Sequence, residues 1–161
     1  MLNSKFIFLN GPSSSGKSTL ARKMQENLSE PYLHLGIDKV IALMPDKFND
    51  WSGKKVEQGF WWDVKYDESG KQIATIMLGP LAVRVSELLK QFCITALDNG
   101  HNVIIDEVCC IESTFAKWQE ALSKYSGIYV GVKASELTLE TREKERGDRM
   151  LGSAVAQSWL V

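Results

Sequence analysis

The sequence of 161 residues is 44% hydrophobic, 24% charged and 9% aromatic, which excludes a disordered, collagen-like or coiled-coil chain and predicts one globular domain over residues 1–161. Lysine and arginine together number 19, against 20 for aspartate and glutamate, so the formal net charge is −1. This even balance provides no overall field that would attract nucleic acid or an acidic membrane, so neither is expected as a partner.

Short apolar runs alternate with segments of helical periodicity, which predicts an α/β fold in which helices wrap a parallel sheet. The long helix after Gly79 has a core stripe that we expect to comprise Leu81, Val85, Leu88, Leu89, Phe92 and Ala96. The predicted elements in chain order are a strand at 5–10, a helix at 18–28, a strand at 32–36, a short helix from Asp38 that Pro45 ends, a hairpin within 46–78, the long helix up to Asn99, a strand at 102–106, a helix at 113–124, a strand at 128–132, a helix at 135–146 and a last segment from 153.

Residues 46–79 interrupt the α/β alternation, and we interpret them as an insertion on the substrate side. Phe60, Trp62, Val64 and Tyr66 alternate with polar positions up to the turn at 67–70, as is typical of a hairpin. The aromatic residues gathered here suit either the wall of a substrate pocket or the packing of the hairpin on the sheet, and packing accounts for most of them.

The N-terminus and the cysteines favour a cytoplasmic location. The chain enters an apolar strand at once, without the apolar region and cleavage site of a signal peptide, and no stretch has the length of a membrane span. The cysteines, at positions 93, 109 and 110, are odd in number and lack zinc-site spacing, as expected in a reducing compartment.

A complete phosphate-binding motif, G-x-x-x-x-G-K-[ST], directly follows the first predicted strand and opens a helix. Glycines let successive backbone N–H groups point inward, and the helix N-terminus adds partial positive charge, so the loop can hold a nucleotide triphosphate. Lys17 would reach the β- and γ-phosphates, and the Ser18 hydroxyl would bind Mg²⁺. The alternative is a serine-rich surface turn that contains a lysine by accident. The residues expected to bind the cofactor are Gly11, Pro12, Ser13, Ser14, Ser15, Gly16, Lys17, Ser18 and Thr19.

Two carboxylates follow the strand at 102–106, at the sheet edge where the phosphate loop is expected. We expect Asp106 to hold Mg²⁺ or its water ligands and assign no role to Glu107. The alternative is a carboxylate that caps the next turn.

Arg142, Arg146 and Arg149 fall at i, i+4 and i+7, on one face of a continuing helix. One interpretation is a lid over residues 142–152 that closes these arginines over the transferring phosphoryl group and bends at Gly147. The other is a solvated charged helix in which Glu143, Glu145 and Asp148 pair with them.

Asp38 follows the strand at 32–36 and therefore lies at the same sheet edge as the loop. It could orient an acceptor hydroxyl and take its proton, or it could be the N-cap of the next helix; the two roles are compatible. His34 and His101 lack metal-ligand spacing and are expected to be structural or at the surface.

With these residues assembled, the sequence resembles the chloramphenicol phosphotransferase family of P-loop kinases. The resemblance is carried by the segments at 7–18, 35–38, 44–45, 104–108 and 142–149. It implies a P-loop three-layer sandwich like that of nucleoside monophosphate kinases, with ATP and Mg²⁺ as cofactors. It places Asp38 as catalytic base, Lys17 and Ser18 on phosphate and magnesium, and Arg142, Arg146 and Arg149 in the lid.

Members of that family continue past the lid into another strand and helix, whereas this sequence ends at Val161, so we expect four to five strands. The family phosphorylates a hydroxyl of the antibiotic. The aromatic insertion leaves the small-molecule acceptor open, because related P-loop kinases act on sugars, shikimate or nucleotides. A non-catalytic nucleotide-binding module is the alternative, and a signalling GTPase is disfavoured because the guanine-reading N-K-x-D string is absent.

Overall fold

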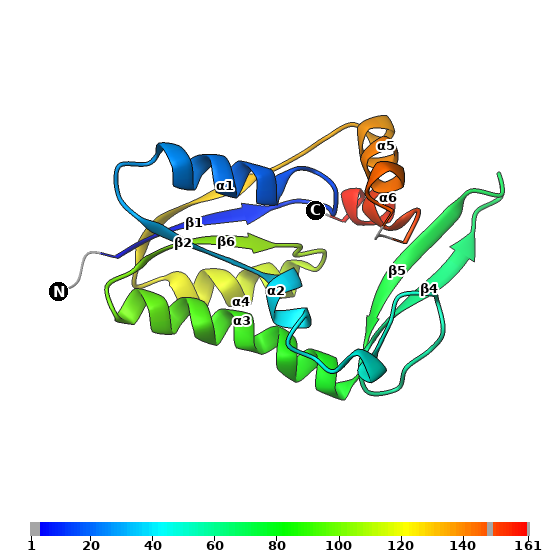
Figure 1. The fold of residues 1–161 in the computed structure, drawn as a ribbon, viewed down its shortest axis with the longest axis horizontal. Helices are drawn as coiled ribbons and strands as arrows, with labels where there is room; N and C mark the ends of the chain where they lie inside the picture. Colours follow the sequence, from blue (N-terminus) through cyan, green and yellow to red (C-terminus); the bar gives the residue numbers. More distant parts are fainter. Residues whose placement is uncertain (1–3, 148–149, 161) are drawn as a thin grey trace.

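The computed structural model describes residues 4–147 and 150–160 (Figure 1). Within them, four strands form a parallel sheet in the order β2 (Tyr32–Gly36), β6 (Asn102–Glu107), β1 (Lys5–Asn10) and β7 (Ser126–Gly131). Helix α1 (Lys17–Asn27) covers one face, and α3 (Pro80–Asp98) and α4 (Glu112–Leu122) cover the other (Figure 1). The predicted three-layer α/β arrangement is confirmed, and the described residues form four of the predicted four to five strands.

The two central strands are apolar because helices cover both of their faces. Phe8 and Ile105 pack toward α3 and α4, whereas Leu9 and Ile104 pack with Ala21 of α1. Each of these side chains is fully buried. The register pairs Leu9 with Asp106 and Gly36 with Asp106, so the last residues of β1, β6 and β2 meet at one edge of the sheet.

The insertion forms a second, three-stranded sheet of β3 (Asn49–Asp50), β4 (Phe60–Tyr66) and β5 (Gln72–Leu78), preceded by a 3-10 helix at Asp46–Phe48. It stands apart from the main sheet in Figure 1. Phe60 and Trp62 are buried, and Trp51 stacks on Phe60 with ring centroids 6.3 Å apart. These aromatic residues therefore serve largely to pack the hairpin.

Two details of the predicted helices are wrong. In α3 the fully buried residues are Ala82, Leu89, Cys93 and Leu97, and Phe92 is 42% exposed. Leu89 of the predicted stripe is fully buried, and Leu81, Val85, Leu88 and Ala96 pack partly buried against the core, so Phe92 is the member of the stripe that was predicted wrongly. In addition, α2 (Ile37–Ile41) begins one residue before Asp38 and has Gly36 as its N-cap, so Asp38 lies in the first turn of the helix and does not cap it.

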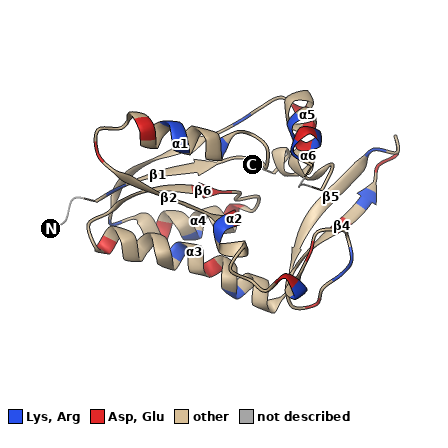
Figure 2. Cartoon of the chain, in the orientation of Figure 1, with Lys and Arg blue, Asp and Glu red and all other residues tan. Residues whose placement is uncertain are grey.

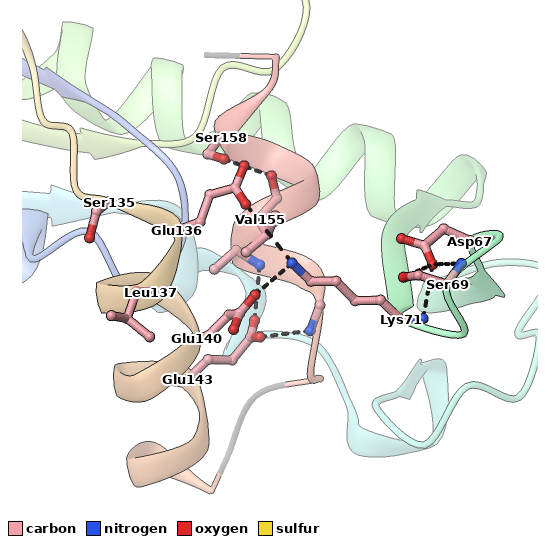
Figure 3. Close-up of polar contacts among 12 residues, drawn as sticks. Asp67, Ser69, Lys71, Ser135, Glu136, Leu137, Glu140, Glu143, Val155 and Ser158 are labelled. Carbon is pink, nitrogen blue, oxygen red and sulfur yellow. Dashed lines mark hydrogen bonds and ion pairs between the residues drawn. The ribbon is translucent and has the colours of Figure 1, made fainter.

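The C-terminal helices are held together by a buried carboxylate. Glu143 of α5 (Glu136–Arg146) is 1% exposed and accepts hydrogen bonds at the start of α6 (Ser153–Ser158), from Gly152 N at 2.7 Å, Ser153 Oγ at 2.6 Å and Ala154 N at 2.9 Å (Figure 3). The free N–H groups of a helix N-terminus favour such an anion. Glu143 therefore does not belong to the solvated, charge-paired helix considered above.

The hairpin also contacts this C-terminal unit. The Gln72 side chain donates to Leu151 O at 2.9 Å, and Lys71 Nζ lies 2.6 Å from Glu140 of α5 (Figure 3). Gly152 has a φ of +83°, and a Cβ there would lie 2.1 Å from Gln72 O, so only glycine permits this approach. Within the described ranges, 4–147 and 150–160, no helix is both long and apolar enough to cross a membrane.

Replacing Glu143 with glutamine should lower the free energy of unfolding by about 1–3 kcal/mol, because an amide nitrogen would face N–H and O–H donors and the charge-assisted hydrogen bonds would be lost. Urea unfolding followed by circular dichroism measures this. The control is Glu145→Gln on the exposed face of the same helix, which should leave the midpoint nearly unchanged. Equal midpoints for the two variants would contradict the anchoring role of Glu143.

Candidate functional site

The loop between β1 and α1 has a backbone that glycines make possible. Gly16 precedes α1 with a φ of +103°, and Ser14 has a φ of 60°. A Cβ on Gly11 would lie 2.3 Å from Val132 O, so the loop passes directly against the chain that leaves β7. This curled loop at a helix N-terminus has the form of an anion-binding site.

Two hydroxyls inside the loop suit a bound phosphate. Ser14 and Ser15 are 8% and 6% exposed, and neither Oγ atom has a hydrogen-bond partner within the described part of the chain. Buried polar atoms normally have partners because leaving one unpaired is costly. The residues of the loop therefore fit a phosphate, whose oxygens would accept hydrogen bonds from these hydroxyls.

Lys17 lies beneath the loop. Its side chain is 7% exposed, and Nζ donates to Gly11 O at 2.9 Å and Pro12 O at 2.8 Å. The same nitrogen lies 4.0 Å from Asp106 Oδ1. A buried ammonium with these partners is placed to turn toward phosphate oxygens bound in the loop.

Ser18 and Asp106 form the link between the loop and β6. Ser18 Oγ donates to Asp106 Oδ2 at 2.6 Å, and His34 Nε2 lies 3.3 Å from the same oxygen. Burial would raise the pKa of Asp106, but the hydrogen bonds from His34 and Ser18 and the charge of Lys17 outweigh it and hold the pKa below its ordinary value. Asp106 is therefore a carboxylate over the physiological pH range.

Oxygen ligands of this kind fit Mg²⁺, which proteins commonly hold through one or two side chains together with substrate phosphates. Ser18 is exposed and Asp106 lies next to it, so both could contribute to such a site. No group of three or more His, Cys, Asp or Glu side chains suited to a metal occurs among the described residues. A metal here would therefore depend on the nucleotide for its remaining ligands.

Acidic segments, coloured red in Figure 2, lie at the end of β6 and beside α2. Their carboxylates differ in environment. Glu107 is 9% exposed, and burial raises its pKa to about 7, with the charges of Asp106 and Asp38 adding to the effect and Val108 N–H and Lys17 opposing it. Asp38 is exposed in the first turn of α2, directly after β2. Asp38 comes two residues after Gly36, which pairs with Asp106, so the predicted base lies at the same edge as the predicted metal-site residues.

Of the three predicted lid arginines, Arg142 contacts the loop. Its Nη1 donates to Ser15 O at 3.1 Å and to Ser14 O at 3.3 Å. Arg146 lies one turn further along, exposed at the end of α5, and Gly147 follows it with a φ of +65°. Arg149 lies outside the described residues. Thr19, also predicted to bind the cofactor, is exposed in the first turn of α1.

Two residues at the site were missed from the sequence. Gln157 of α6 accepts a hydrogen bond from Ser13 N at 2.7 Å, which joins the C-terminal helix to the loop. His34, expected to be structural or at the surface, contacts Asp106. His34 lies two residues before Gly36 on the same strand face, and Gly36 pairs with Asp106. This pairing is known only from the folded chain, so no signal in the sequence pointed to His34 or to Gln157.

Comparisons with known proteins bear on the fold. The chain superposes on a chain of the Pnkp1/Rnl/Hen1 RNA repair complex with a TM-score of 0.68 at 18% identity, covering 98% of this chain and 42% of that chain. It also superposes on a structure described as a "putative kinase" from Chloroflexus aurantiacus, with a TM-score of 0.62 at 17% identity, covering 98% and 76% of the two chains. The chain thus spans about two fifths of the RNA-repair protein, and the fold is that of P-loop kinases.

Sequence comparison identifies the family. Two Mycobacterium tuberculosis proteins from different strains, each named "Putative O-phosphotransferase", are 33% identical over 155 residues, which is 94% of this chain and 67% of theirs. A family model described as "Chloramphenicol phosphotransferase-like protein" matches residues 4–161, almost the entire sequence. The chain therefore belongs to the chloramphenicol phosphotransferase-like family.

Proposed function

We propose that the protein is an ATP-dependent phosphotransferase that moves the γ-phosphate to a hydroxyl group of a small molecule. The observation that carries this proposal is the 2.6 Å hydrogen bond from Ser18 to Asp106 beside the buried Lys17. It joins a phosphate-binding loop to a carboxylate at the sheet edge, as phosphoryl transfer from a nucleotide requires.

Each residue has a distinct part in the proposed reaction. The loop N–H groups and Lys17 would bind and orient the phosphates, and Ser18 with Asp106 would hold Mg²⁺, which when bound neutralises part of the phosphate charge. Asp38 would accept the proton of the acceptor hydroxyl as its oxygen bonds to the γ-phosphorus and the bond to the β-phosphate oxygen breaks. ADP and the phosphate ester are the products.

The lid arginines would compensate the negative charge that develops on the transferring group. Arg142 already lies against Ser14 and Ser15, so a small rotation of its side chain would direct the guanidinium from the loop carbonyls to a bound phosphate. Arg146 and Arg149 remain predicted members of the same group.

The acceptor class is supported by family membership. The family model and the mycobacterial relatives are described as phosphotransferases, and the relatives are named O-phosphotransferases, which transfer phosphate to an oxygen atom. We therefore expect a hydroxyl group as the acceptor. Chloramphenicol is the first acceptor to test, followed by sugars and nucleosides. Because one fold neighbour belongs to an RNA repair complex, an oligoribonucleotide belongs in the same panel.

An ADP-release screen over this panel tests the function, with mass spectrometry locating the new phosphate. The proposal expects acceptor-stimulated ADP release and a product heavier by one phosphate. Tight ATP binding without ADP release above background for every acceptor would favour the non-catalytic nucleotide-binding module.

Replacing Lys17 or Asp38 should separate binding from chemistry. Lys17→Ala removes the ammonium beside the phosphates and should abolish measurable turnover, whereas Asp38→Asn should retain ATP binding and lose about 10²–10⁴-fold in single-turnover rate. Calorimetric ATP titration and rapid-quench assays supply the two readouts. Undiminished transfer by the Asp38 variant would contradict its assignment as the base.

Arg142→Ala should lower kcat by about 10²-fold or more while changing the KM for ATP much less, because the guanidinium is expected to act mainly in the transition state. Steady-state assays at saturating acceptor measure both constants. Lys144→Ala, which removes an exposed cation from the same helix, is the matched control and should behave like the wild type. A kcat equally insensitive to both substitutions would contradict the lid role.

A further inference from the structure

His34 lies beside the proposed metal site through the pairing of two strands. Gly36 of β2 is paired with Asp106 of β6, and His34, two residues earlier, points to the same face of the sheet. A Cβ on Gly36 would lie 3.3 Å from the Asp106 Cβ, so the Asp106 side chain lies directly over this glycine. The imidazole approaches the carboxylate from the neighbouring position on that face.

The contact between these residues is buried. Both side chains are 9% exposed, and His34 Nε2 lies 3.3 Å from Asp106 Oδ2. Ser18 Oγ donates to the same oxygen at 2.6 Å, while the other carboxylate oxygen faces Lys17 at 4.0 Å. Donors from two elements, α1 and β2, thus surround one carboxylate and fix its rotation.

The orientation of Asp106 determines what Ser18 can do. A serine hydroxyl has one hydrogen, and here that hydrogen is directed to Asp106 Oδ2. The lone pairs of Ser18 Oγ are therefore turned away from Asp106 and are available to a cation. If Asp106 rotated, the hydroxyl would lose this partner and with it the fixed direction of its lone pairs.

We propose that His34 is a positioning residue for magnesium: its Nε2–H holds Asp106 in the orientation that receives the Ser18 hydroxyl hydrogen, which directs the Ser18 lone pairs to the ion. This inference rests on the proposed function of the loop. It assigns His34 no contact with the nucleotide or the metal, because it acts through Asp106. Residues that orient metal ligands in this way commonly contribute about 10–100-fold to metal affinity.

A matched pair of variants tests the hydrogen bond apart from packing. His34→Gln and His34→Met have side chains of nearly the same length and shape, but only glutamine places an N–H near the position of Nε2. The affinity of Mn²⁺ for the protein–ADP complex, measured by electron paramagnetic resonance, should weaken about 10-fold or more in the Met variant and stay within about threefold of wild type in the Gln variant. The affinity for ADP without metal should be equal in both.

Activity provides a second readout. The Mg²⁺ concentration that gives half-maximal ADP release should shift in the Met variant by the same factor, and kcat should recover at saturating Mg²⁺. His101→Met at the opposite end of β6 is the background control. If the Met variant does not fold, as judged by urea unfolding, His34→Asn replaces it, because its shorter amide does not reach Asp106 and should weaken Mn²⁺ equally.

The outcomes distinguish this inference from the proposed function. Wild-type protein that binds no ADP with either metal would overturn both. Wild-type protein that binds Mn²⁺ and ADP, together with Met and Asn variants of unchanged Mn²⁺ affinity, would overturn the positioning role alone. Equal weakening in the Gln and Met variants would also overturn it, because shape and not the donor would then be responsible.

Discussion

The buried carboxylate of Asp106 is the group on which the arrangement of the site depends. A charge removed from water is costly unless it is paired and hydrogen-bonded, and Asp106 obtains its partners from β2 and from the start of α1, where the phosphate loop ends. Those partners can converge only if β6 lies between β1 and β2, which is the strand order observed. The parallel sheet thus brings the ends of three strands to one edge, and the charge of Asp106 holds their side chains there.

The C-terminal helices contact the phosphate loop as well. Glu143 anchors α6 to α5, Gln157 joins α6 to Ser13, and Arg142 joins α5 to Ser14 and Ser15. Through Gln72 the same unit contacts the inserted hairpin. The ion pair of Lys71 with Glu140 is a further contact between the hairpin and α5, but it is partly exposed and adds little to stability (Figure 3). The phosphate loop, the C-terminal helices and the inserted hairpin are consequently connected by direct contacts.

Much of the fold could be predicted because its signals are local. The strands at 5–10, 32–36 and 72–78 are apolar or alternating runs, and their predicted bounds agree with β1, β2 and β5. The loop motif is local too. The buried face of α3 was predicted only in part: five of the six predicted residues pack in the core, but Phe92 is apolar and exposed, whereas the small Ala82 is buried. Helical periodicity does not determine which apolar face meets the sheet.

The candidate site was only partly predictable for a similar reason. Lys17, Ser18 and Asp106 follow from a motif and a strand end, whereas the contact of His34 with Asp106 depends on which strand is the neighbour of β6. In the sequence, Glu143 cannot be distinguished from the other charged residues of its helix. Its burial depends on a partner helix that begins ten residues later. Long-range pairing of this kind is a property of the folded chain and leaves no pattern in a short window.

The measurement that tests the central claim most directly is the fate of the terminal phosphate of [γ-³²P]ATP incubated with the protein, Mg²⁺ and the acceptor panel. The proposed chemistry predicts that the label leaves ATP and appears in a phosphate ester of one acceptor class, and that the Lys17→Ala protein leaves the label in ATP. Label that stays in ATP, or that is released only as inorganic phosphate with every acceptor, would contradict the assignment of this site to phosphoryl transfer.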